Sequence, residues 1–311
     1  MEEQSHEEMI QLVMASQFNQ VPKYISRIAI GICNEVYRVG LEKEEVIVRL
    51  SPHDRFLMGS HDHIPKFKAL GIRVPDILAE DYSKNLIPYS YQVLSKIEGE
   101  DLGQVIEKLS DSQLQDLSKE IANIFEKVRT IPSSNKFGVI WGGGDDEISD
   151  TWTERMKIWI EESKERGLDD ETVSIADNLY ERYQSYFSTV RPTTYYGDVC
   201  YKNVMIYNGI FNGLVDLDGL TQGDPLEALG RIKISWYGTR HGEIYLTAIM
   251  DELELNKEQR KLVTMYALLN QISMSCENDI QFNQNTKAEV DKHKKCKDKA
   301  MIKKLAFELG V

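Results

Sequence analysis

Alternating apolar and polar residues in the first hundred positions predict a small antiparallel β-sheet. Residues 24–30 and 35–41 alternate with a period of two, and a third run of this kind covers residues 45–50. A period of two places every second side chain on the same face of a strand. Residues 54–70 have the spacing of a helix, and residues 86–94 predict a further strand. We therefore expect an N-terminal sheet that carries one main helix.

The apolar period changes from two to that of a helix shortly after the last of these strands. A helical pattern covers residues 110–128, and most of the chain beyond it is also helical in pattern. The change predicts an N-terminal lobe of residues 1–95 and a larger, mainly helical C-terminal lobe of residues 96–311, with a hinge at about residues 95–99. The expected fold class is therefore α+β with two lobes.

Composition narrows the class of protein further. The chain has 311 residues, of which 41% are hydrophobic, and a formal net charge of −13. We find no apolar run of about 18 residues and no basic N-terminal signal region, so we expect no membrane partner. The four cysteines form no C-x-x-C pair, which favours a reduced, cytoplasmic setting. The negative charge argues against nucleic-acid binding and is compatible with a cationic small substrate.

The most specific chemical signal is a spacing of three polar residues. Asp198 is followed five residues later by Asn203, and a second acid, Asp216, stands further along the chain. Residues 203–207 and 211–216 look like two short strands joined by an Asn-Gly pair, which is a strong hairpin signal. Such a hairpin brings its outer ends together, so Asn203 and Asp216 are expected to share one site.

These residue types suit phosphoryl transfer. The reaction depends on positioning and on neutralising charge, and a carboxylate can orient the acceptor hydroxyl and take its proton. We assign this role to Asp198. Mg²⁺ prefers oxygen ligands and needs few from the protein, so Asn203 and Asp216 are the candidate ligands. The alternative is a surface hairpin with ordinary acidic turn residues, which explains each residue alone but not their combination.

A nucleotide site can be assembled from the N-terminal lobe. Gly31 and Asn34 lie in the turn between the first two predicted strands, where backbone N–H groups can contact phosphates. Arg49 on the third strand supplies a cation for the phosphate oxygens. At the hinge, the backbone from Ser95 to Ile97 is placed to exchange hydrogen bonds with the nucleotide base.

The string that follows Asp218 is explained by helix capping. Asp224 can cap a new helix, Pro225 suits its first position, and Glu227 stands three residues after the cap in a capping-box arrangement. We interpret Asp224 as an architectural residue.

Taken in order, these features resemble the aminoglycoside phosphotransferase and choline kinase superfamily, small-molecule kinases with the protein-kinase fold. The resemblance covers about residues 24–236, and its most specific part is residues 197–224. It implies that Asp198 is the catalytic base, that Asn203 and Asp216 bind Mg²⁺, and that Arg49 is the phosphate-contacting cation. ATP or GTP would be the phosphoryl donor.

Three positions depart from the pattern of that superfamily. Tyr196 stands where His usually precedes Gly-Asp, and Arg49 stands where Lys is common. The helix predicted at residues 54–70 should carry a Glu partner for the strand cation, but it contains no Glu. Asp62 is the nearest carboxylate that could replace it, although a solvated helix acid explains Asp62 equally well.

The sequence thus predicts a Mg²⁺-dependent phosphotransferase that acts on a hydroxyl of a small molecule. An aminoglycoside-type antibiotic is the favoured acceptor, and a choline, ethanolamine or sugar kinase is the alternative within catalysis. A pseudokinase that binds nucleotide without turnover is the alternative of another class. The missing helix Glu and the Arg at position 49 favour it, and the presence of Asp198, Asn203 and Asp216 opposes it. The acceptor, the choice between ATP and GTP, and the oligomeric state stay open.

Overall fold

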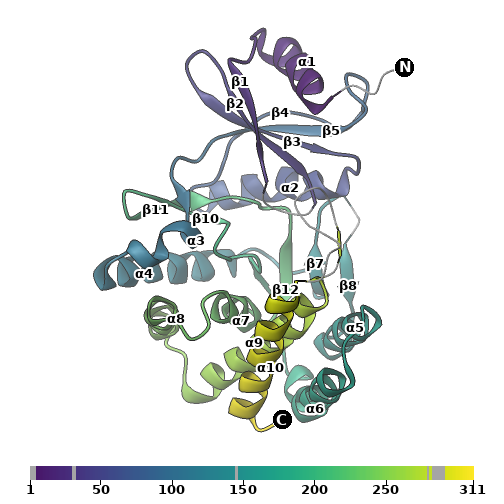
Figure 1. Ribbon diagram of the computed structural model, residues 1–311, viewed down its shortest axis with the longest axis vertical. Helices are drawn as coiled ribbons and strands as arrows, with labels where there is room; N and C mark the ends of the chain where they lie inside the picture. The colour runs from purple at the N-terminus through teal and green to yellow at the C-terminus, as the bar shows by residue number, and fades with distance from the viewer. Residues whose placement is uncertain (1–4, 30–32, 144–145, 279, 282–290) are drawn as a thin grey trace.

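The N-terminal part of the chain forms a five-stranded antiparallel sheet with the order β1-β2-β3-β5-β4. This computed structural model describes residues 5–29, 33–143, 146–278, 280–281 and 291–311. The strands of the sheet are β1 (Tyr24–Ile28), β2 (Glu35–Gly40), β3 (Glu45–Ser51), β4 (Ile77–Asp81) and β5 (Ser90–Ser95). The sheet at the top of Figure 1 therefore contains the four strands that the alternating pattern predicts, and β4 is a fifth strand at its edge.

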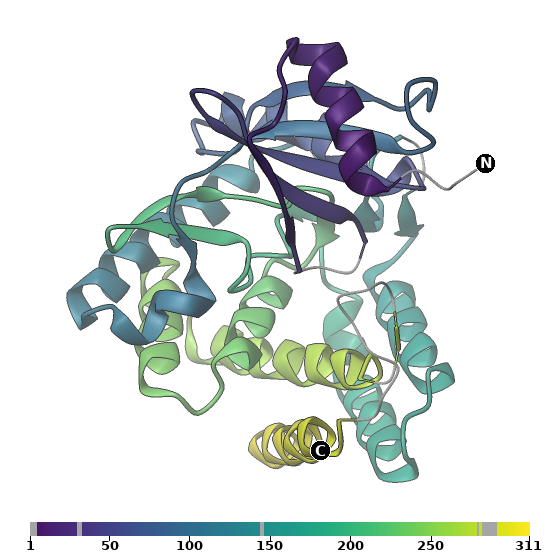
Figure 2. The same ribbon diagram turned by 45° about the horizontal axis from the view of Figure 1, so that its top comes forward.

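The two faces of this sheet are covered by different helices. Val46, Val48 and Leu50 of β3 are fully buried against α1 (His6–Phe18), which crosses the sheet in Figure 2. Because side chains alternate along a strand, Arg49 points to the opposite face. No helix was predicted at the position of α1. Its signal is a capping box at its start, in which Ser5 and the third helical residue bond each other's backbone N–H groups.

The predicted main helix is α2 (Arg55–Ala69), which lies between the sheet and the lower part of the molecule (Figure 1). Its apolar residues Ile64 and Phe67 belong to the same core cluster as Leu217 and Leu220 from the other lobe. At Gly59 the helix backbone approaches the second lobe so closely that a Cβ would lie 1.6 Å from the carbonyl oxygen of Asp218. The helix is thus packed directly onto the strand end that carries the second half of the site.

Two small sheets connect the lobes and lie beneath α2. The first has the order β11-β10-β6 and the second has the order β8-β7-β12-β9. Their strands are β6 (Glu100–Asp101), β7 (Phe137–Ile140), β8 (Glu147–Ser149), β9 (Thr193–Tyr195), β10 (Val204–Tyr207), β11 (Ile210–Leu214) and β12 (Leu220–Gly223). Only β10 and β11 were predicted from the sequence, because the Asn-Gly pair marks the turn between them. The other strands have two to four residues, no readable alternation and no such turn signal.

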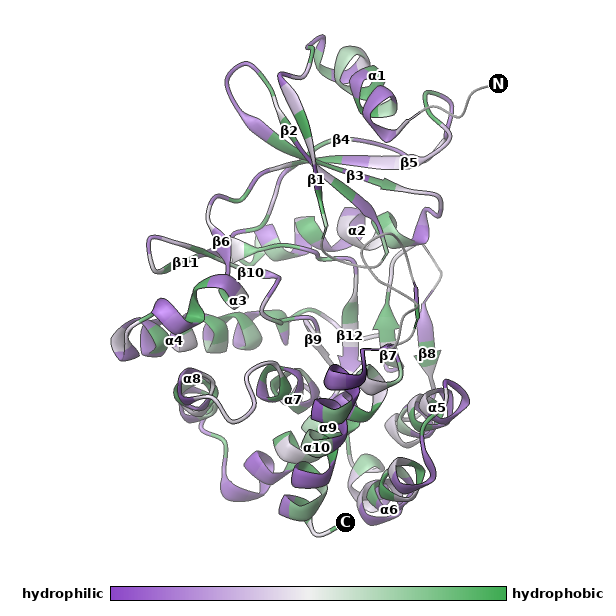
Figure 3. Ribbon diagram, viewed as in Figure 1, coloured by the Kyte–Doolittle hydropathy of each residue, from purple (hydrophilic) through white to green (hydrophobic). Residues whose placement is uncertain are grey.

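The rest of the chain is mainly helical, as expected. Its helices are α3 (Leu102–Val105), the 3₁₀ turn η1 (Ile106–Lys108), α4 (Asp111–Val128), α5 (Trp152–Glu165), α6 (Asp170–Phe187), α7 (Leu226–Ser235), α8 (Arg240–Glu252), α9 (Lys257–Ser275) and α10 (Lys292–Leu309). Hydrophobic and hydrophilic residues alternate around these helices in Figure 3, as amphipathic packing requires. In the described part of the chain, no helix has the length and apolar character to cross a membrane.

The last strand of the five-stranded sheet ends at Ser95, and β6 begins at Glu100. The proposed division into residues 1–95 and 96–311, with a hinge at 95–99, stays a prediction. The packing of α2 into the core of the second lobe shows that the two parts are not independent in this structure.

Candidate functional site

The predicted hairpin is confirmed. Val204 pairs with Leu214, and the N–H of Val215 donates to the carbonyl of Asn203 at 3.0 Å. The turn residues Asn208 and Gly209 have φ values of 52° and 76°. Two successive positive φ values are typical of a type I′ turn, whose twist matches that of the strands. The hairpin therefore brings Asn203 next to the residues that precede Asp216.

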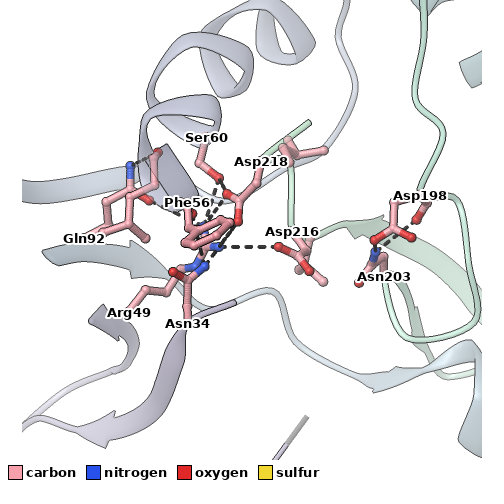
Figure 4. Close-up of polar contacts among 12 residues, drawn as sticks. Asn34, Arg49, Phe56, Ser60, Gln92, Asp198, Asn203, Asp216 and Asp218 are labelled. Atoms are coloured by element: carbon pink, nitrogen blue, oxygen red, sulfur yellow. Dashed lines mark hydrogen bonds and ion pairs between the residues drawn. The ribbon is translucent and has the colours of Figure 1, made fainter. Parts of the chain in front are cut away.

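Asp198 lies in the loop between β9 and β10, and both of its carboxylate oxygens accept hydrogen bonds. The Asn203 side-chain amide donates to Asp198 Oδ2 at 2.6 Å, so the predicted base and a predicted metal ligand are in direct contact (Figure 4). Arg231 donates from Nη1 to Asp198 Oδ1 at 2.9 Å. With its side chain 30% exposed, Asp198 is both held and accessible.

Asp216 directly follows the hairpin and lies between Asp198 and the cluster around Arg49 in Figure 4. Its φ of 63° is in the left-handed region, which is uncommon for residues other than glycine. Tyr196 stabilises this conformation, because its hydroxyl donates to the carbonyls of Val215 and Asp216 at 3.0 and 2.9 Å. The Tyr that replaces the usual His thus supports the backbone of the second acid.

Two cations approach the Asp216 carboxylate from different sides. Lys202 Nζ lies 3.9 Å from Asp216 Oδ2 and also 3.9 Å from Asp198 Oδ2, and Arg49 lies 3.4 Å from Asp216 Oδ1. Removal from water and the charge of Asp218 raise the pKa of Asp216, while Arg49 and Lys202 oppose this effect. Burial lowers the pKa of Lys202, but the carboxylates of Asp198 and Asp216 outweigh burial and raise it. Lys202 is therefore a stable cation between the two acids.

Arg49 projects from β3 into a buried cluster below α2. Its Nη1 donates to Asp218 Oδ1 at 2.8 Å and its Nη2 contacts Asp218 Oδ2, so the pair is bidentate. Ser60 of α2 bonds both partners, accepting from Arg49 at 2.9 Å and donating to Asp218. The Asn34 side-chain amide donates to Asp218 Oδ2 at 3.2 Å. The cluster joins the turn before β2, strand β3 and helix α2 to Asp218, which stands 158 residues after Ser60 (Figure 4).

The acid partner of Arg49 differs from the one expected. Among the described residues, the carboxylates that contact Arg49 are those of Asp218 and Asp216, and α2 contributes the hydroxyl of Ser60 instead. Asp62 lies beside Gly142, where its Oδ2 would be 2.7 Å from an added Cβ. The helix carboxylate that is missing from the sequence is thus replaced by Asp218, to which the sequence alone assigned no role.

The remaining predicted nucleotide residues occupy different places. Gly31 lies outside the described residues. Asn34 is buried, and its side chain is engaged by Asp218 and by the carbonyl of Phe56. Ser95 ends β5 and bonds Asp76 through its backbone N–H and its hydroxyl. Ile97 is buried, and within the described residues its backbone N–H and C=O make no hydrogen bond.

The residues at the hairpin ends fit a magnesium ion. Because Asn203 turns its amide nitrogen to Asp198, its amide oxygen is left free of that contact. This oxygen and the partly exposed carboxylate of Asp216 are the hard oxygen ligands that Mg²⁺ prefers. Two protein ligands are sufficient in kinases, since phosphate and water oxygens complete the octahedron.

The capping arrangement expected at residues 224–227 is only partly observed. Asp224 Oδ1 accepts from the N–H of Leu226 at 3.1 Å, so Asp224 does stabilise the start of α7. Glu227 is not part of a capping box. Its buried carboxylate accepts instead from the hydroxyl of Tyr195 at 3.1 Å. Arg231 was not predicted either, because it stands one turn after Glu227 and belongs to no local sequence pattern.

Comparisons with known proteins agree with this geometry. Residues 25–262 match the family model described as the phosphotransferase enzyme family (APH), which is more than half of the chain. No curated protein sequence matches the chain.

Several solved structures have a similar backbone. A thermostable mutant of aminoglycoside phosphotransferase APH(4)-Ia in a ternary complex with AMP-PNP and hygromycin B is 11% identical, with a TM-score of 0.73 over 96% of this chain and 98% of that chain. The GDP complex of wild-type aminoglycoside 2'-phosphotransferase-IIIa is 12% identical, with a TM-score of 0.73 over 98% and 99%. The GDP and kanamycin complex of APH(2")-IIIa is 14% identical, with a TM-score of 0.67 over 96% and 95%. At these identities the likeness shows the fold, which is the two-lobed, kinase-like fold expected from the sequence.

Proposed function

Since the chain belongs to the phosphotransferase enzyme family, we propose that it transfers the γ-phosphoryl group of ATP or GTP to a hydroxyl group of a small molecule, with Mg²⁺. The observation that carries this proposal is the meeting of Asp198, Asn203 and Asp216 at one end of the β10–β11 hairpin. An ordinary surface hairpin has no need for a held carboxylate, a turned amide and a second acid in the left-handed region at the same point.

In this proposal Asp198 acts on the acceptor. Its carboxylate accepts a hydrogen bond from the acceptor hydroxyl and takes the proton as the hydroxyl oxygen bonds to the γ-phosphorus. The bond between that phosphorus and the nucleoside diphosphate oxygen breaks in the same displacement. Asn203 holds one oxygen of Asp198 in place, so the hydroxyl meets a carboxylate of fixed orientation.

Other residues have the role of binding the nucleotide. The amide oxygen of Asn203 and the carboxylate of Asp216 would hold Mg²⁺, which neutralises charge on the phosphates when it is bound. Lys202 lies beside both acids and is placed to contact the transferred phosphoryl group. Arg49 and the loop that contains Gly31 and Asn34 would contact the phosphates. The backbone of Ile97, which makes no hydrogen bond among the described residues, would bind the base.

The arrangement of Arg49 supports an enzyme over a pseudokinase. The argument for a pseudokinase was that the strand cation has no acid partner on the main helix. Asp218 supplies this partner from the second lobe through a bidentate contact, and Ser60 connects both to α2. The cation that a kinase needs is therefore held in place by other means.

For the acceptor we propose an aminoglycoside-type compound first. The fold is shared with structures whose complexes contain hygromycin B and kanamycin, which are small molecules rich in hydroxyl groups. The formal net charge of −13 is compatible with a cationic acceptor of this kind. Choline, ethanolamine and sugars are the alternative acceptors within the same chemistry.

Nucleotide consumption in the presence of Mg²⁺ tests the proposal. ATP and GTP should each be supplied with hygromycin B, kanamycin, choline, ethanolamine and a set of sugars. We expect acceptor-dependent formation of nucleoside diphosphate by the wild-type protein and a loss of at least 100-fold in Asp198→Ala. Asp116→Ala, which removes an exposed carboxylate on α4, is the matched control and should keep full activity. Equal rates for wild type and Asp198→Ala would contradict the proposed role of Asp198.

A further inference from the structure

The contact between Arg231 and Asp198 links the catalytic loop to a helix that the proposed function does not use. Arg231 stands on α7, 33 residues beyond Asp198, and donates to Oδ1 at 2.9 Å. Asn203 donates to the other oxygen, Oδ2, at 2.6 Å. Each carboxylate oxygen of Asp198 therefore has its own donor, and the two donors come from different elements. A carboxylate held at both oxygens cannot rotate without losing a hydrogen bond.

The position of Arg231 is fixed by the packing of α7 on α9. Its neighbour Gly230 lies so close to α9 that an added Cβ would be 2.6 Å from the backbone nitrogen of Ala267. One turn earlier, the buried Glu227 accepts from Tyr195, and its carbonyl accepts from the Asn270 side chain at 3.4 Å. These contacts fix the position of α7 along its axis and its rotation about that axis. A rigid helix therefore holds the Arg231 guanidinium against Asp198.

Arg231 differs from the second cation near Asp198 in what it contacts. Lys202 lies 3.9 Å from Asp198 Oδ2, which is beyond hydrogen-bonding distance, and is equally close to Asp216. Among the described residues, Asp198 is the hydrogen-bond partner of the Arg231 side chain. A planar guanidinium that bonds a carboxylate fixes its orientation, whereas an ammonium acts as a point charge. Arg231 is thus suited to orienting the Asp198 carboxylate, and Lys202 is suited to supplying positive charge beside the two acids.

We propose that Arg231 is a positioning residue for the phosphoryl transfer, which holds the carboxylate of Asp198 in the orientation that receives the acceptor hydroxyl. This inference rests on the proposed function, because it assigns the role of Arg231 through the role of Asp198. Arg231 bonds Asp198 and also interacts by charge with the buried Glu227, and among the described residues it has no hydrogen bond or ion pair with Asn203 or Asp216. Its loss therefore slows the transfer step and leaves nucleotide binding intact.

The experiment compares Arg231→Met and Arg231→Lys with the wild type. Arg231→Met removes the guanidinium but keeps an unbranched side chain, and we expect a decrease of about 100-fold in kcat, the cost typical of a misplaced catalytic group. Arg231→Lys keeps a cation at this position, and its kcat should be about tenfold higher than that of Arg231→Met. The Kd for AMP-PNP or GDP with Mg²⁺, measured by calorimetry, should stay within about twofold in both variants. Lys233→Met removes a cation from the same helix and is the matched control, with wild-type kcat expected.

A double-mutant cycle separates positioning from a merely structural role. In an Asp198→Asn background, Arg231→Met should cost less than about threefold further, because a residue that acts through Asp198 has nothing left to position. Additive losses, an unchanged kcat in Arg231→Met, or a weakened nucleotide Kd would each overturn the role of Arg231. If the wild type binds nucleotide but turns over no acceptor, the proposed function fails and this inference fails with it. Turnover by the wild type that is insensitive to Arg231 leaves the proposed function standing.

Discussion

At the scale of single residues, the site depends on a few charged groups that are satisfied by partners from distant parts of the chain. Arg49 and Asp218 are both buried, and they neutralise each other across 169 residues of sequence. Removing one member of such a pair is costly, because the other charge stays buried without its partner. This makes Asp218 a residue whose loss should affect both stability and nucleotide binding.

Asp218→Asn is expected to lower the free energy of unfolding by about 3–5 kcal/mol, the usual cost of an uncompensated buried charge. It should also weaken the binding of AMP-PNP or GDP, since the only carboxylate then left in contact with Arg49 among the described residues would be that of Asp216. Urea denaturation and calorimetry measure the two effects. Asp62→Asn is the matched control, and a change of less than about 0.5 kcal/mol is expected there. If Asp62→Asn weakens nucleotide binding and Asp218→Asn does not, Asp62 is the functional partner of Arg49 after all.

The buried side chain of His63 should make the stability of the folded protein depend on pH. Its Nδ1 contacts the carbonyl of Leu217 at 3.0 Å, and its Nε2 has no hydrogen-bond partner among the described residues. Burial lowers the pKa of His63 to about 4 from the ordinary value of 6.5, although the Leu217 carbonyl opposes this shift. The folded protein therefore binds this proton less readily than the unfolded chain, and stability falls as the pH drops from 6.5 towards 4.

Between pH 7.5 and pH 5, this single histidine should reduce the free energy of unfolding by about 2 kcal/mol, and the loss should grow as the pH approaches 4. His63→Gln replaces the imidazole N–H by an amide N–H donor that cannot titrate, so the stability of this variant should depend less on pH by this amount. Urea denaturation of both proteins at the two pH values gives the difference. Equal pH dependence in both would show that His63 is protonated as easily in the folded protein as in the unfolded chain.

At the scale of elements, local sequence patterns predicted the helices and strands whose formation depends on neighbouring residues. The runs that became β2 and β3, the helix α2 and the Asn208-Gly209 hairpin were all predicted, because period and turn chemistry are written in adjacent residues. Strands such as β6 and β12 were not predicted. They have two to four residues and exist only because distant strands pair with them.

The residues of the site divide in the same way into those that a local pattern predicts and those that depend on the packing of distant elements. The residues that lie on one hairpin, Asn203 and Asp216, were predicted together with Asp198 because their spacing is local. The partners of the charged groups were missed or misassigned. Asp218 was quoted without a role, Asp62 was offered in its place, and Arg231 was not noticed. Each of these contacts depends on how elements pack on one another, and a single sequence holds no direct record of that packing.

The close approach of α2 to the backbone of Asp218 predicts how a substitution at Gly59 of this helix changes stability. In a helix, replacing Gly by Ala normally stabilises by about 1 kcal/mol, because Gly has the higher conformational entropy when unfolded. At Gly59 we expect the opposite, a destabilisation of about 1–3 kcal/mol, since a Cβ would overlap the carbonyl of Asp218 and push the helix away. Thermal or urea unfolding measures the sign directly. Lys66→Ala on the same helix is the control, and a stabilised Gly59→Ala would show that α2 is not in contact with that strand.

At the scale of the whole molecule, the two lobes share a core although their sheets are separate. Phe67 of α2 is fully buried, its ring lies edge-on to that of Tyr196 at 5.8 Å between centroids, and both belong to a cluster that includes Leu217 and Leu220. A core shared in this way couples the stability of the N-terminal lobe to that of the C-terminal lobe. It also makes the relative position of Arg49 and Asp218 a property of the entire fold.

Phe67→Ala should therefore destabilise both lobes together. All four tryptophans of the chain lie in the C-terminal lobe, so their fluorescence reports on that lobe, while circular dichroism reports on the whole molecule. Removing a buried Phe side chain costs about 3–5 kcal/mol. If the lobes unfold as one unit, both signals should shift to lower urea by the same amount, even though the substitution is in the N-terminal lobe.

Phe307→Ala, at a side chain that is 87% exposed on α10, is the matched control and should shift neither. A fluorescence transition that stays in place while the circular dichroism transition splits would mean that the lobes unfold independently, and that the contact between Arg49 and Asp218 can open without loss of the C-terminal fold.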